Sequence, residues 1–112
     1  RATIFLACMG PTGLRQMAEL CAQKAHYLAE KIAKIPGWTL ANPKTPFFHE
    51  FVAKSPVPAA KLNEKLMAKG IIGGYDLGLK YPELKNHVLF CVTEKRTKEE
   101  IDAFISTLTA IT

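Results

Sequence analysis

Three histidines and three cysteines are the side chains of this 112-residue sequence best suited to acid–base or metal chemistry. They are His26, His49, His87, Cys8, Cys21 and Cys91. Neither set has the spacing of a metal site. The sequence also contains no Ser-His-Asp or Cys-His signature, no phosphate-binding GxxxxGK and no HExxH. We therefore expect no catalytic residue, no metal ligand and no cofactor-binding residue in this chain.

Individual positions support the same expectation. His26 lies beside an apolar helix stripe and is interpreted as structural or solvated. His49 and Glu50 are adjacent within a predicted strand, which would point their side chains to opposite faces. The alternative interpretation is that His49 or Glu50 acts as a general base. Each cysteine lies on an apolar face or run, so buried, reduced thiols and a reducing compartment are expected.

The most unusual stretch is GIIGGYDLGLKYPEL, residues 70–84, which holds four of the seven glycines. Glycine accepts positive φ and lets the backbone approach other groups closely, so this density indicates an unusual path. One interpretation is a tight turn in which Asp76 accepts a local hydrogen bond. The other is a shaped contact loop, whose members would be Gly73, Gly74, Tyr75, Asp76 and Gly78. On the second view, Gly74→Val should harm assembly or activity more than folding.

Apolar periodicity and capping signals give the elements that hold this loop. Residues 1–9 are interpreted as the remnant of a preceding helix that ends at Gly10-Pro11, with Thr12 as the next N-cap. Further elements are expected in this order: a helix at 12–34, strands at 38–41 and 47–53, a helix at 58–69, a short strand, a strand at 86–93, and a helix opened by a Thr97/Glu100 capping box.

This order predicts a single α/β domain over residues 1–112, more closely an α+β two-layer sandwich. Its small, mostly antiparallel sheet would carry helices on one face. Both alternating sets of the last strand are apolar, with Val88 and Phe90 on one face and Leu89 and Cys91 on the other. A sheet covered on one side should alternate apolar with polar residues. The second face should therefore meet something outside this chain, either another domain or a second copy.

Composition limits the class of partner. The net charge of +5 comes from scattered lysines without an aromatic-interleaved basic patch, so nucleic-acid binding is not expected. No apolar run approaches the roughly 18 residues of a membrane span, so no membrane-spanning segment is expected. The basic and apolar start, RATIFLACM, is too short in its apolar part for a signal peptide.

The loop GIIGGYDLG, the following YPEL and the run VTEKRTKEEID at residues 92–102 together resemble one family. Residues 23–29, QKAHYLA, and the segment PFF before EFV are similar to it as well. The family is the glycine decarboxylase P-protein, in particular the C-terminal end of subunit 1 of glycine dehydrogenase (decarboxylating). The resemblance covers nearly the whole chain, and the glycine loop joined to VTEKRTKEEID is its most specific part.

The resemblance implies the C-terminal small domain of a fold-type-I pyridoxal-phosphate enzyme chain, with its large domain absent. The parent heterotetramer would decarboxylate glycine and pass the aminomethyl group to the lipoyl arm of H-protein in a bacterial or archaeal cytoplasm. Pyridoxal phosphate would belong to subunit 2, and this chain would have a structural and interfacial role, inactive alone. The glycine loop would lie near the subunit interface or the active-site entrance. Two alternatives remain: an independent dimeric module that binds a small acid through Tyr75-Asp76, or the small domain of another such enzyme, for example an aminotransferase.

Overall fold

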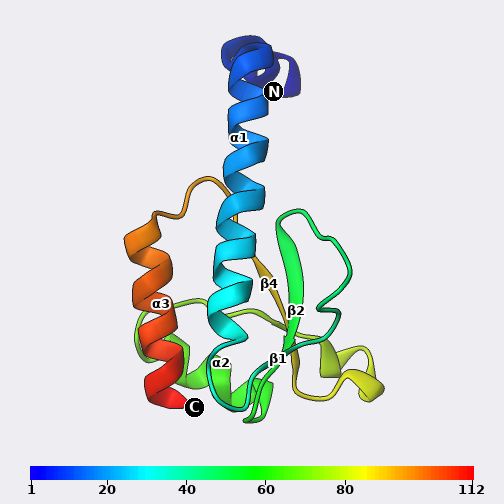
Figure 1. Ribbon diagram of the computed structural model, residues 1–112, viewed down its shortest axis with the longest axis vertical. Coiled ribbons are helices and arrows are strands. Elements are labelled where there is room, and N and C mark those ends of the chain that lie inside the picture. Colours follow the sequence, from blue (N-terminus) through cyan, green and yellow to red (C-terminus); the bar gives the residue numbers. More distant parts are fainter.

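The computed structural model describes all residues, 1–112, as three helices and a four-stranded sheet (Figure 1). The helices and strands are α1 Ala2–Ile32, β1 Thr39–Leu40, β2 Glu50–Lys54, α2 Ala59–Met67, β3 Tyr75–Asp76, β4 His87–Cys91 and α3 Lys98–Ile111. Two short 3₁₀ turns, η1 Leu77–Leu79 and η2 Pro82–Leu84, separate β3 from β4. The predicted order of elements is confirmed, with the short strand placed inside the glycine segment.

The sheet has the strand order β1-β2-β4-β3, and every neighbouring pair is antiparallel. In the central pair, Phe51 faces Phe90 and Ala53 faces Val88. These four side chains point to the same face and are all buried. The predicted antiparallel α+β sandwich is therefore confirmed.

All three helices cover that one face of the sheet (Figure 1). The core joins the inward side chains of the sheet to apolar residues of each helix, namely Leu28 and Ile32 of α1, Leu62 and Leu66 of α2, and Ile101 and Leu108 of α3. The heptad-like stripe of α1 faces the sheet because its apolar residues recur on one side of the helix. No helix is long and apolar enough to cross a membrane.

The other face of the sheet is left uncovered, as the apolar pattern of β4 predicts. Val52 and Leu89 face each other there and are only half-buried, while Tyr75, paired with Leu89, is exposed. We call Val52, Leu89, Tyr75 and Cys91 the outer face. Charged residues at its ends, such as Glu50 and Lys54, are exposed to solvent. The face is thus apolar at its centre and polar at its margins.

Gly10 divides α1 into two helical segments. Its φ of 65° and ψ of 176° are not helical, and the ψ value is the extended one that a residue before proline prefers. Pro11 then begins the second segment at N1, so Gly10 rather than the expected Thr12 occupies the N-cap position. The turns before Gly10 extend beyond the rest of the molecule (Figure 1). The side chain of Phe5 in these turns is exposed.

The last helix is fixed at its start by the predicted capping box. The Thr97 hydroxyl accepts from the Glu100 N–H at 3.1 Å, and the Glu100 carboxylate accepts from the Thr97 N–H at 2.9 Å. One turn on, Asp102 accepts hydrogen bonds from the Tyr27 hydroxyl and from the Lys98 ammonium, both at 2.6 Å. The Tyr27 hydrogen bond joins α3 to α1, and the Lys98 contact lies within α3.

We expect the hydrogen bonds to Asp102 to make the free energy of unfolding depend on pH in the acidic range. The hydrogen bond from Lys98, and then that from Tyr27, lowers the pKa of Asp102 below its ordinary value. A lowered folded-state pKa means that the carboxylate stabilises the fold above its unfolded pKa of about 3.9, and that this contribution is lost as pH falls through the folded pKa. Asp102→Asn should therefore lower the free energy of unfolding at pH 7, with a difference from wild type that shrinks toward pH 2. Urea denaturation at several pH values measures it.

Glu64→Gln is the matched control for Asp102→Asn. Glu64 is an exposed helical carboxylate whose side chain makes no hydrogen bond or ion pair. Its substitution should leave the free energy of unfolding unchanged across the same pH range. An Asp102→Asn deficit of equal size at pH 7 and pH 2 would contradict the prediction.

Candidate functional site

The glycine segment begins as the C-terminal cap of α2. Gly70 has a φ of 73°, and its N–H donates to Met67 O at 2.9 Å while the Ile71 N–H donates to Leu66 O at 3.0 Å. This is the Schellman pattern, for which glycine avoids the Cβ penalty of positive φ. Ile71 also packs against the core, as its position after the cap predicts. The first glycine thus ends a helix.

Two further glycines are explained by close approach to β4 and α2. A Cβ on Gly74 would lie 2.6 Å from Leu89 O and 3.0 Å from Phe90 Cδ1, and would also collide with Val88. A Cβ on Gly73 would collide with the Asn63 side chain. Gly74 O in turn accepts from Asn63 Nδ2 at 2.9 Å, which fixes the loop to α2. The backbone at Gly73 and Gly74 can pack this closely against α2 and β4 only because neither residue has a side chain.

This packing corrects the expectation about Gly74→Val. The expectation that assembly or activity would suffer more than folding rested on the density of glycines beyond what a helix end requires. The space beside Gly74 is filled by the chain's own sheet. Substitution must therefore harm the folding of this domain first.

The turn interpretation of Asp76 is confirmed. Its Oδ1 accepts the Gly78 N–H at 2.9 Å, and the residue caps the 3₁₀ turn that follows. The side chains that the segment leaves exposed include Ile72 (85%) and Tyr75 (48%) and also the charged Lys80 and Glu83. A contact role for the loop stays a prediction, in which Ile72 and Tyr75 would make the outward contacts.

A cleft of about 530 Å³ lies beside the loop, between β4 and α3. Its lining is mainly apolar and includes Ile71, Phe90 and Phe104. The charged residues in the lining are Arg96 and Glu100, which pair with each other at 3.6 Å. Both side chains are at least half exposed to solvent, and Arg96 is the one basic residue in the lining of the cleft.

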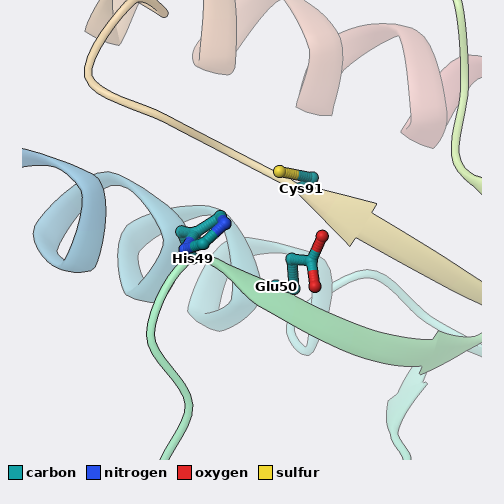
Figure 2. Close-up of side chains that lie close together, drawn as sticks. All are labelled: His49, Glu50 and Cys91. Atoms are coloured by element: carbon teal, nitrogen blue, oxygen red, sulfur yellow. The ribbon is translucent and has the colours of Figure 1, made fainter. Parts of the chain in front are cut away.

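The structure assembles one group of polar side chains that the sequence pattern did not predict. Figure 2 shows His49 and Glu50 at the start of β2 and Cys91 at the end of β4, with one ligand atom of each within 4.8 Å of the others. His49 precedes β2 rather than lying within it, so the expected separation of His49 and Glu50 onto opposite faces is wrong. Glu50 and Cys91 are direct cross-strand partners. These residues meet because of the long-range register between β2 and β4, and the spacing of residues in the sequence does not reveal that register.

The environment of this group favours a neutral thiol. Burial, followed by the nearby Glu50 carboxylate, raises the pKa of the Cys91 thiol above its ordinary value. The Nδ1 atom of His49 is buried and has no hydrogen-bond partner. An unpaired buried polar atom costs about 1–3 kcal/mol, so a partner for this nitrogen would stabilise the fold.

The other histidines and cysteines have structural surroundings. His26 Nε2 lies 2.9 Å from Phe47 O, and its ring stacks on Phe47 at 4.0 Å, which confirms its structural interpretation. Cys21 is buried and donates to Glu94 at 3.3 Å, and burial raises its pKa. Cys8 and Cys91 are exposed, so the expectation of three buried thiols holds for Cys21 only.

Comparison with known proteins places this geometry in a family. Residues 1–108 match the family described as glycine cleavage system P-protein. A probable glycine dehydrogenase (decarboxylating) subunit 1 from Desulfitobacterium hafniense is 54% identical over 104 residues, which are 93% of this chain and 23% of that protein. The corresponding protein of Moorella thermoacetica is 48% identical over 98% of this chain and 24% of its own length.

The fold agrees with the sequence match. A crystal structure of glycine decarboxylase (P-protein) of the glycine cleavage system, in inhibitor-bound form, superposes with a TM-score of 0.88 and 31% identity, over 97% of this chain and 24% of that one. The α+β fold is that of part of the fold-type-I pyridoxal-phosphate enzymes. The chain spans about a quarter of the length of the relatives it matches. By sequence and by fold, the chain belongs to the glycine cleavage system P-protein family.

Proposed function

We propose that this chain works as the C-terminal small domain of a glycine dehydrogenase (decarboxylating) subunit 1, with a structural and interfacial role. The parent complex would decarboxylate glycine and transfer the aminomethyl group to the lipoyl group of H-protein. The observation that carries the proposal is the uncovered apolar sheet face of a chain whose relatives are about four times longer.

The outer face is the proposed docking surface for the remainder of the same polypeptide. Val52 and Leu89 are half-buried at its centre and Tyr75 is exposed beside them, an apolar patch that water disfavours. Exposed charges at its ends, such as Lys54, would form the polar rim common at interfaces. A covering domain would bury these side chains as a second layer of the sandwich.

The glycine loop is proposed to contact the subunit interface or the active-site entrance through its exposed side chains. Gly73, Gly74 and Asp76 would act by fixing the loop, since each is engaged within this chain. Tyr75 and Ile72 would make the outward contacts, since both side chains are exposed. The partners proposed are subunit 2 and, through the complex, H-protein.

The cleft and the smaller hollow near β2 lack the groups that hold pyridoxal phosphate. That cofactor is held by a Schiff-base lysine and by groups that bind its phosphate. No lysine lines the cleft or the smaller hollow near β2, and the arginine of the cleft is paired with Glu100. We therefore propose that the cofactor is bound on the partner subunit.

Reconstitution tests this function. The chain would be mixed with the remainder of its subunit 1 and with subunit 2, in the presence of pyridoxal phosphate and lipoylated H-protein. Release of labelled CO₂ from carboxyl-labelled glycine should require the chain, and the intact subunit 1 serves as the positive control. A folded chain that neither joins this complex nor restores CO₂ release would contradict the proposal.

A further inference from the structure

We propose that His49, Glu50 and Cys91 bind one zinc ion at the end of the sheet where β2 begins and β4 ends. Imidazole nitrogen, carboxylate oxygen and thiolate sulfur are the three ligand types that zinc uses in proteins. Three protein ligands leave a fourth position for water or another group. The site lies at the end of the outer face, which is the proposed docking surface, and zinc binding by the isolated chain can be measured whether or not that docking role holds.

The positions of the ligand atoms are close to those that zinc requires. A tetrahedral ion with bonds of about 2.0–2.3 Å holds its ligand atoms about 3.3–3.8 Å apart. One ligand atom from each of the three residues already lies within 4.8 Å of the others. Small side-chain rotations would therefore close the site without moving the strands.

The backbone holds the three residues in this arrangement. Glu50 and Cys91 are opposite each other in the β2–β4 register, and the Val92 N–H donates to His49 O at 2.9 Å. The ring of Phe48 meets the imidazole of His49 edge to face at 4.8 Å between centroids, which limits its rotation. Pre-organised ligands reduce the entropy lost on binding.

The surroundings of His49 and Glu50 leave both side chains free to bind a cation. The Nδ1 atom of His49 is buried without a hydrogen-bond partner, and metal coordination would satisfy a ring nitrogen at this position. The Glu50 carboxylate forms no ion pair with any basic side chain. Figure 2 shows both side chains close to Cys91, and Glu50 and Cys91 are exposed enough for an ion to enter.

The experiment is titration of the reduced chain with Zn²⁺ by calorimetry and with Co²⁺ as a spectroscopic substitute. We expect one ion per chain and a sulfur-to-cobalt charge-transfer absorption, which reports coordination by a thiolate. Cys91→Ser should abolish this absorption, and His49→Gln should weaken binding of both ions. Circular dichroism of each variant establishes that it remains folded.

Matched controls use the same residue types elsewhere in the chain. Cys8→Ser removes the other exposed thiol, and His87→Gln removes a histidine of the same sheet. Both should bind Zn²⁺ and Co²⁺ as the wild type does. Glu50→Gln offers a second test that removes a charge from an exposed position with little risk to folding. Absence of one-to-one binding, or Co²⁺ absorption that survives Cys91→Ser, would overturn the proposal.

Discussion

Gly74→Val is expected to destabilise this domain by about 3 kcal/mol or more, a large part of the 5–15 kcal/mol that holds a typical domain folded. The added Cβ would lie 2.6 Å from Leu89 O, which belongs to the neighbouring strand backbone. A backbone atom in a paired strand cannot move aside as a flexible side chain can. The two branches of valine would add further collisions with Val88 and Phe90. Urea denaturation of the isolated chain, followed by circular dichroism, measures the effect.

Gly13→Ala is the matched control for this substitution. Gly13 lies within α1, and a Cβ there would be 3.4 Å from Met9 Cε, an ordinary contact. Alanine should stabilise the helix by about 0.5–1 kcal/mol because glycine loses more backbone entropy. Gly74→Ala should still destabilise, since the collision begins at Cβ. Equal free energies of unfolding for Gly74→Val and Gly13→Ala would contradict the close packing of Gly74 against β4.

Leu89→Lys should leave the isolated chain folded and weaken its binding to the rest of subunit 1 and subunit 2 by about a hundredfold or more. This prediction rests on the proposed docking role of the outer face. Leu89 is half-buried at the centre of that face, opposite Val52 and beside Tyr75. A charge left unpaired in a dry interface costs about 3–5 kcal/mol, and each 1.4 kcal/mol is tenfold in affinity. Sedimentation velocity of the mixed components measures the binding.

Met67→Lys supplies the control, because it adds the same charge at an apolar residue of α2 that is 59% exposed. Its binding should equal that of the wild type. The unfolding free energy of each isolated chain separates a folding defect from a docking defect. Equal binding by Leu89→Lys and wild type would remove the outer face from the proposed interface.

Local chemistry along the sequence determined most of the architecture. The Thr97/Glu100 box fixed the start of α3, Gly70 the end of α2, and Gly10-Pro11 the break in α1. The doubly apolar pattern of β4 predicted a sheet with one uncovered face. These features depend on groups a few residues apart or on periodicity within one element, so the sequence contains them directly.

Only the tertiary structure decided what the glycines and the polar groups do. Gly74 is required by the side chains and backbone of β4, which are distant in sequence, and Asp76 is used within its own turn. His49 and Cys91 meet because β2 pairs with β4 in one register, and a shift of one residue would send their side chains apart. Long-range register depends on the whole packed core, which no short motif specifies. The sequence determined the elements, and packing between them determined which side chains meet.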